Sequence, residues 1–258
     1  MATYTTEIAS DKLISDNPIH QRLLKAYIAA KPWISGSLLE IGCGEGRGVE
    51  QLLPLADSYI GLDKIGEVID MLRTKFPGVD FRQAVIPPFS GFEDNSYDTI
   101  VSFQVIEHIP NDRLFLQEIY RMLKPGGKAI ISTPNITHTL SRNPWHEREY
   151  KPQELIDLAV GIFDKVEAKG IGGNEKVWAY HEANRKSVQK IMRFDIFDLQ
   201  HKLPASVLRM PYEILNRMNR NKLHKQQGSS VVEITHEDFP VVEDPMKGWD
   251  LFYLIWKK

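Results

Sequence analysis

The feature that most constrains this chain is an apolar run that ends in closely spaced glycines. Residues 38–41 predict a buried strand, and Gly42, Gly44 and Gly46 follow directly before a helix-length stretch. Glycines let backbone amides approach a ligand closely, and the N-terminus of the next helix adds oriented donors. A dinucleotide-binding turn requires a glycine at position 47, where the chain has Arg47. The turn therefore predicts a ligand site of a different class from that of the nicotinamide enzymes.

Strand-length apolar runs recur along the chain and are separated by helix-length stretches. After residues 37–41 they lie at 58–62, 99–103, 128–132, 162–169 and 250–256, with helices expected at 19–30, 113–123 and 152–160. This alternation is typical of βα units that build a parallel sheet. The predicted fold class is α/β, with a doubly wound, mostly parallel, seven-stranded Rossmann-like sheet and an inserted helical lid.

One segment interrupts the alternation with helical spacing and a strong charge bias. Residues 185–225 hold ten Lys and Arg against three Asp and Glu, a net charge of +7, while the remaining chain carries −9. We expect Pro204 and Pro211 to break its helices. The predicted organisation is an N-terminal helical cap (1–36), a core (37–173 and 229–258) and a basic helical insertion (174–228). The insertion favours an anionic partner, or else it is a solvated face without a specific partner.

Composition narrows the class of protein. The 258 residues are 42% hydrophobic and 26% charged, as in a globular protein that folds by burying a core. Cys43 is the only cysteine, and the N-terminus lacks the pattern of a signal peptide, so we expect a soluble, cytoplasmic protein. No metal site is expected, because four histidines share no ligand spacing with one another or with Cys43: His181, His201, His224 and His236.

Asp63 ends the second predicted strand, about twenty residues after the glycine turn, where a carboxylate can accept ribose hydroxyls. Taken alone, it would more simply cap the next helix. Together with residues 39–46, 98–109 and 118–127, however, it makes the sequence similar to the class I S-adenosylmethionine-dependent methyltransferases with a type 11/12-like domain. The resemblance covers about residues 18–170 and the last strand.

This resemblance implies a set of cofactor contacts. Gly42, Cys43, Gly44 and Gly46 would line the methionine and ribose moieties of S-adenosylmethionine, and Glu40 would anchor their loop. Asp63 would hold the ribose hydroxyls, and the adjacent Lys64 would be a further cofactor contact. Gln83 and Ala84 take the place of the acidic residue and alanine that meet the adenine in many relatives. After the fourth strand, the cofactor contacts would be Phe103, Gln104 and His108.

Methyl transfer from a sulfonium is an in-line displacement, and an oxygen or nitrogen acceptor can need a general base. Histidine supplies one best near neutral pH, and the candidates are His20, His108, His138 and His146. His146 is favoured, with His108 second, because His146 follows the fifth strand at the carboxyl edge. Predicted substrate contacts are His20, Trp145, Arg148 and Tyr150. The alternative is that the aromatic residues pack this loop while His146 and Arg148 form surface pairs.

The predicted function is transfer of a methyl group to an oxygen of a small-molecule or glycan acceptor, before nitrogen or carbon, with S-adenosylhomocysteine as product. An anionic acceptor would suit the basic insertion, which also offers membrane contact through Met192, Phe194 and Phe197. The alternatives are a non-catalytic nucleoside-binding scaffold and a nucleic-acid methyltransferase. The second is disfavoured because Tyr212 is the only tyrosine of the basic residues 185–225, which leaves little base stacking.

Overall fold

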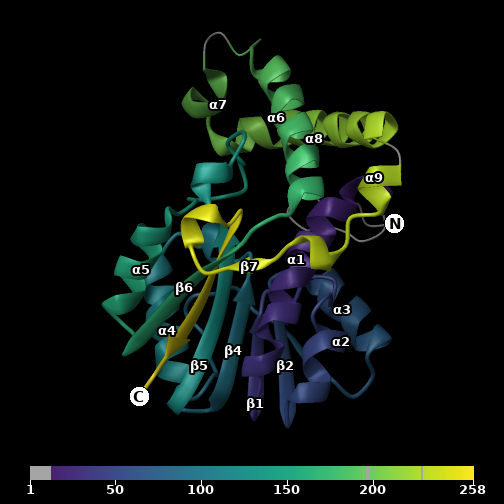
Figure 1. The fold of residues 1–258 in the computed structure, drawn as a ribbon. Coiled ribbons are helices and arrows are strands. Elements are labelled where there is room, and N and C mark those ends of the chain that lie inside the picture. Colours follow the sequence, from purple (N-terminus) through teal and green to yellow (C-terminus); the bar gives the residue numbers. More distant parts are fainter. Residues whose placement is uncertain (1–12, 194, 196–197, 228) are drawn as a thin grey trace.

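The computed structural model describes residues 13–193, 195, 198–227 and 229–258, and it contains one mixed sheet with helices on both faces (Figure 1). The sheet order is β3-β2-β1-β4-β5-β8-β6-β7. Its strands are β1 (Ser37–Ile41), β2 (Ser58–Asp63), β3 (Asp80–Gln83), β4 (Tyr97–Phe103), β5 (Leu123–Pro134), β6 (Lys165–Ile171), β7 (Val241–Val242) and β8 (Asp250–Trp256). The predicted α/β class with a mostly parallel sheet is confirmed.

The strand pairing shows where the sheet departs from the prediction. Strands β1 to β5 pair in parallel, whereas β8 inserts antiparallel between β5 and β6. The described residues form eight strands rather than seven, because the two-residue β7 adds an antiparallel edge to β6. Strand β6 begins at Lys165, three residues after the predicted start at Ile162.

Helices cover the two faces of the sheet and bury separate apolar clusters. The helices are α1 (Asn17–Ala30), α2 (Val49–Leu52), α3 (Gly66–Lys75), α4 (Asp112–Met122), α5 (Pro152–Val160), α6 (Glu175–Met192), α7 (Leu199–Lys202), α8 (Ala205–Gln227) and α9 (Ser229–Val232). Helices α1, α2 and α3 pack with Leu38 and Val101 on one face, and α4 and α5 pack with Leu39 and Ile100 on the other. Alternate residues of each strand thus point to opposite layers.

Helices α6 to α9 lie beyond the carboxyl ends of the parallel strands (Figure 1). The expected break at Pro211 was wrong, because Pro211 lies inside α8, while Pro204 directly precedes that helix. Proline lacks the amide hydrogen that would bond to the carbonyl of Val207. Val207 is exposed, so water can satisfy that carbonyl and α8 continues.

Only one of the three residues predicted to contact a membrane lies within the described part of the chain. Met192 is half-buried at the end of α6, and Phe194 and Phe197 lie outside the described residues. Among the helices that the structure describes, none combines the length and apolar character needed to cross a bilayer. Membrane contact stays a prediction.

A buried charge cluster ties the insertion to the start of the chain. Asp16 is 2% exposed, and its carboxylate lies 3.0 Å from Nη1 of Arg217 and 3.3 Å from Nη1 of Arg220, both on α8. The next residue, Asn17, donates its side-chain amide to the carbonyls of Val231 and Ile234. These contacts fix α8 and the segment after it against α1.

Asp16→Ala should loosen this attachment, because it leaves two arginines at a buried site without their counter-ion. Removing one partner of a buried ion pair costs about 3 kcal/mol of unfolding free energy. Urea unfolding would measure that loss, and limited proteolysis would show faster cleavage within residues 175–232. Asp70→Ala is the matched control, because Asp70 pairs with Arg73 at the exposed surface. Equal stability of the two variants would contradict the anchoring role.

Candidate functional site

The glycine turn is held against the end of β2 by backbone hydrogen bonds. The amides of Gly42 and Cys43 both donate to the carbonyl of Leu62, each at 2.8 Å. Gly42 has φ of 77°, in the left-handed region, and a Cβ there would lie 2.3 Å from Cγ2 of Val105. Only glycine fits this close approach without strain. The turn is therefore built at the junction of β1, β2 and β4.

Asp63 completes the turn from the end of β2. Its Oδ2 accepts a hydrogen bond from the Gly44 amide at 2.9 Å, and its Oδ1 accepts one from the Ile65 amide at 3.0 Å. Burial raises the pKa of this carboxyl, and the two backbone bonds oppose that rise. Each carboxylate oxygen can accept more than one hydrogen bond, so Asp63 can also bind hydroxyl groups of a ligand.

A cavity of about 350 Å³ opens beside this turn. Most of the predicted cofactor contacts line it, namely Gly42, Cys43, Gly44, Asp63, Lys64, Ala84, Phe103, Gln104 and His108. Residues outside the predicted set of cofactor contacts also line it, among them Tyr27, Glu45, Arg47, Ile65 and Ile86. For two of these residues the sequence offered a signal, because Glu45 and Arg47 lie inside the glycine turn itself.

Three predicted cofactor contacts do not line the cavity. Gly46 faces the core, where a Cβ would lie 2.5 Å from Cδ2 of Leu72. Gln83 points away, and its Nε2 donates to the carbonyl of Lys64 at 3.0 Å. Glu40 is 1% exposed and acts from beneath the site. The structure therefore assigns these residues to shaping the turn and its surroundings.

Glu40 connects the cofactor side of the sheet with α1. Its two carboxylate oxygens accept hydrogen bonds from the hydroxyls of Tyr27, at 2.8 Å, and Tyr59, at 2.5 Å. Tyr27 lines the cavity, and its ring covers Gly48 so closely that a Cβ there would overlap it. Burial raises the pKa of Glu40 from 4.5 to about 7, although both hydroxyls lower it. Glu40 thus positions α1 over the turn.

A second cavity of about 280 Å³ adjoins the first, and Leu23, Gln104 and His108 line both. Its other walls come from the loop after β5 and from the insertion, which contributes Tyr180 and Asn184 of α6 and Tyr212, Asn216, Asn219 and Arg220 of α8. Gln104, at the junction, has φ of 58°. That left-handed conformation costs a non-glycine residue about 1 to 3 kcal/mol, and such strain is concentrated at functional sites.

His146 lies in this second cavity within a directed hydrogen-bond network. Its Nδ1 is 2.7 Å from Oε1 of Glu149, and its Nε2 is 2.8 Å from Nδ2 of Asn143. The Asn143 amide is oriented by the backbone, because its Oδ1 accepts from the Trp145 amide. Nδ1 therefore donates and Nε2 accepts, which describes a neutral imidazole. The carboxylate of Glu149 was missed from the sequence, although it lies three residues after His146.

His108 meets His146 edge to face, with 4.9 Å between ring centroids. Nδ1 of His108 is 2.8 Å from the carbonyl of Trp145, so that nitrogen is the donor. His138 lines the same cavity, with Nε2 3.2 Å from the carbonyl of Met246. The structure thus brings together three of the four histidines proposed as bases.

The predicted substrate contacts do not line either cavity. Arg148 and Tyr150 both bond to the carboxylate of Asp112 and secure the loop to α4. Trp145 stacks beneath the guanidinium of Arg209, with 4.1 Å to its ring centroid. His20 accepts a hydrogen bond from Nε of Arg47 at 3.2 Å. The packing alternative describes these aromatic residues, because the loop needs anchors to hold His146 in place.

Comparisons with known proteins agree with this geometry. Residues 39–131 match the family described as methyltransferase domain. A probable S-adenosylmethionine-dependent methyltransferase of Mycolicibacterium smegmatis is 40% identical over 126 residues, which cover 47% of this chain and 49% of the relative. Residues 39–131 are a class I S-adenosylmethionine-dependent methyltransferase domain. It is an enzyme domain, and its cofactor is S-adenosylmethionine.

Two further relatives place the methyltransferase domain among known proteins. A ubiquinone biosynthesis O-methyltransferase of Xanthomonas oryzae is 26% identical over 150 residues, covering 50% of this chain and 63% of that protein. The crystal structure of a Thermotoga maritima S-adenosylmethionine-dependent methyltransferase shares the fold, with a TM-score of 0.57, 17% identity, and coverage of 93% of this chain and 91% of that one. The chain spans about half the length of the first curated relatives.

The first cavity fits the cofactor of the methyltransferase domain. A Cβ at Gly44 would meet no protein atom within 4 Å. Because Gly44 lines the cavity, that space is open to a ligand lying directly on the backbone. The carboxylate of Asp63 faces the same space and suits ribose hydroxyls, while Ile65 and Ile86 offer apolar surface for a base.

Asp63→Ala should weaken binding of S-adenosylmethionine and S-adenosylhomocysteine by about 10- to 100-fold, because hydrogen bonds to a charged group contribute about 1.5 to 3 kcal/mol. Isothermal titration calorimetry would measure both affinities. Asp57→Ala is the control, because Asp57 is exposed at the opposite end of β2. Unchanged affinity in Asp63→Ala would remove Asp63 from the cofactor site, and binding of NAD alone would overturn the assignment of the cofactor.

Glu40→Gln should change how stability depends on pH. The folded protein takes up a proton on Glu40 near pH 7, whereas the unfolded chain does so near 4.5. Stability from this group is therefore present below pH 4.5 and is lost as pH rises to 7, by about 3 kcal/mol. Urea unfolding at several pH values should show a flatter profile in Glu40→Gln, while exposed Glu243→Gln keeps the wild-type slope. Parallel profiles for Glu40→Gln and wild type would disprove the raised pKa.

Proposed function

We propose that the protein transfers the methyl group of S-adenosylmethionine to an oxygen of a small polar acceptor, a small molecule or a glycan, held in the second cavity. The observation that carries this proposal is the junction of the two cavities at Gln104 and His108. A cofactor in the first cavity and an acceptor in the second would meet there. Gln104 at this junction has a left-handed backbone conformation.

The chain's own residues would divide the work between the two cavities. When bound, S-adenosylmethionine supplies an electrophilic methyl group on a sulfonium. Asp63 and the glycine turn hold the nucleoside part, and Gln104 and His108 border the reacting end. Alignment of the acceptor with this end supplies most of the catalysis, because in-line displacement depends on orientation.

His146 is the group proposed to receive the acceptor's proton. Glu149 fixes its ring by accepting from Nδ1, which places the lone pair on Nε2. Asn143 bonds to that lone pair and is the group that an acceptor hydroxyl would replace. The acceptor oxygen would lose its proton to Nε2 while its bond to the methyl carbon forms and the carbon–sulfur bond breaks. The imidazolium that forms is stabilised by the adjacent carboxylate.

Two observations favour an oxygen acceptor of polar character. The Xanthomonas oryzae relative is named as an O-methyltransferase of ubiquinone biosynthesis. The second cavity is lined by amide, imidazole and hydroxyl groups from Asn135, Asn216, His138 and Tyr212. Such groups hydrogen-bond hydroxylated rings or sugars well. Arg22 and Arg220 also line this cavity, where they pair with Asp250 and Asp16.

His146→Gln should lower kcat for methyl transfer about 10²- to 10⁴-fold, the usual contribution of a general base. Transfer of a labelled methyl group from S-adenosylmethionine to a panel of ortho-diphenols and sugars would measure it. The affinity for S-adenosylmethionine should stay the same, because His146 does not line the first cavity.

His201→Gln is the matched control, because His201 pairs with Asp198 at the surface of the insertion. An unchanged kcat in His146→Gln would rule out its catalytic role. Binding of S-adenosylmethionine without transfer to any acceptor of the panel would favour the scaffold alternative.

A further inference from the structure

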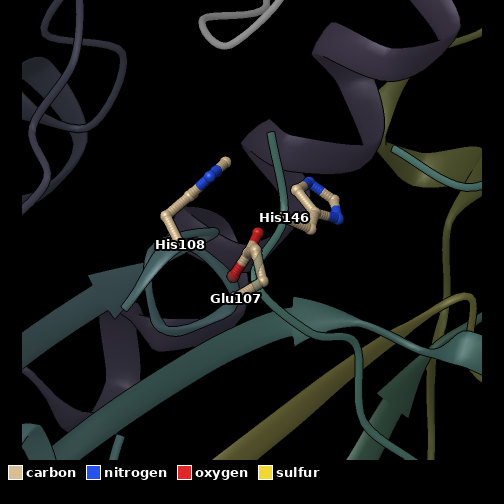
Figure 2. A group of neighbouring side chains, drawn as sticks. All are labelled: Glu107, His108 and His146. Atoms are coloured by element: carbon tan, nitrogen blue, oxygen red, sulfur yellow. The ribbon is translucent and has the colours of Figure 1, made fainter. Parts of the chain in front are cut away.

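Three side chains with metal-binding atoms converge at the junction of the two cavities. Glu107 and His108 end the 3-10 helix Ile106–His108 after β4, and His146 comes from the loop after β5. One ligand atom of each lies within 4.8 Å of those of the other two. Figure 2 shows the three side chains gathered around one space. Residues up to 39 positions apart in sequence thus form one donor set of a carboxylate and two imidazoles.

The two histidines are oriented as metal ligands are. Nδ1 of His108 donates to the carbonyl of Trp145, and Nδ1 of His146 donates to the carboxylate of Glu149. In both rings this tautomer places the lone pair on Nε2. Histidines that bind metals almost always donate their other ring N–H to a carbonyl or carboxylate in this way.

Glu107 has a buried carboxylate that pairs with no lysine or arginine among the described residues. It is 1% exposed, and its Oε2 accepts a hydrogen bond from the hydroxyl of Thr133 at 2.9 Å. Among the described residues, no lysine or arginine pairs with it, although arginines and lysines pair with other buried or half-buried carboxylates, for example Arg22 with Asp250. A buried carboxylate is costly unless a cation or hydrogen bonds compensate for its charge.

We infer that Glu107, His108 and His146 bind a divalent transition-metal cation at the junction of the cofactor and acceptor cavities. Two imidazoles and one carboxylate suit Zn²⁺ or Mn²⁺ and leave coordination positions for another ligand. Mg²⁺ and Ca²⁺ prefer oxygen ligands and should bind more weakly. The separations require the ligand atoms to draw together, since bonds to Zn²⁺ are about 2.0 to 2.2 Å.

The role of this cation rests on the proposed function. An acceptor hydroxyl bound to the cation would have a lowered pKa. Its proton would leave to solvent, its oxygen would bond to the methyl carbon, and the electrons of the carbon–sulfur bond would return to sulfur. In the metal-bound protein His146 is then a ligand rather than the proton acceptor. The metal site predicts that metal binding weakens in His146→Gln, whereas the general-base role alone predicts no metal binding.

Asn143 supplies a variant in which affinity should increase. Its amide nitrogen bonds to Nε2 of His146, and coordination must replace that bond. Asn143→Asp keeps an oxygen for the Trp145 amide and adds a carboxylate beside the site. We expect at least tenfold tighter binding of Mn²⁺, which misfolding could not produce.

The test is calorimetric titration of the chelator-treated full-length protein with Zn²⁺, Mn²⁺ and Mg²⁺. Wild type and His138→Gln, which changes a histidine of the same cavity outside the cluster, should bind one Zn²⁺ or Mn²⁺ with equal affinity. Glu107→Gln and His146→Gln should bind at least tenfold more weakly. Absence of binding, or equal binding in all four proteins, would overturn the inference.

Parallel measurements separate this inference from the proposed function. Methyl transfer by a chelator-treated protein that binds no metal would reject the metal site and leave the methyltransferase activity in place. Stoichiometric metal binding that is lost in Glu107→Gln, without methyl transfer to any acceptor, would support the site and reject the proposed function. Binding of S-adenosylmethionine to each variant reports that the neighbouring cavity is still folded.

Discussion

The functional architecture depends on the hydrogen bonds that join the glycine turn to the end of β2. Leu62 accepts from two consecutive amides of the turn, and Asp63 accepts from Gly44. These bonds hold the carboxyl ends of β1 and β2 together, because parallel strands bring those ends to one edge of the sheet. The cofactor cavity opens above that edge, so its position follows from the register of two strands rather than from any ligand.

Buried carboxylates recur along this edge, and each does a different task. Glu40 accepts from two tyrosine hydroxyls and holds α1 over the turn, whereas Glu107 accepts from Thr133 at the junction of the cavities. Burial raises the pKa of both groups to about 7. Asp250, at the start of β8, is balanced by Arg22. These buried carboxylates are energetically unfavourable, and they lie where the ligands would bind. Such groups are common in active sites.

Sequence patterns predicted the features that depend on local chemistry. The apolar runs predicted six strands, and the spacing of glycines and Asp63 predicted part of the cofactor cavity, because these residues follow consecutive strands. The resemblance to the methyltransferase family implied Ala84, Phe103, Gln104 and His108. The same patterns could not predict long-range partners. Arg148 and Tyr150 were predicted as substrate contacts from their place in the loop. In the structure both donate to the carboxylate of Asp112 on α4. Gln83 and the two-residue β7 likewise depend on neighbours that spacing does not reveal.

The two cavities differ in how much of their lining comes from the matched methyltransferase domain. Residues 39–131, which match the methyltransferase domain, provide nearly all of the first cavity, with Leu23 and Tyr27 as the additions. They provide only Gln104, Glu107 and His108 to the second. The remaining walls come from α1, the loop that carries His146, the insertion and the segment before β8. The first cavity is thus formed mainly by the matched domain, whereas the proposed acceptor would contact mainly residues outside it. The cluster at the junction lies where these two parts meet, with Glu107 and His108 from one and His146 from the other.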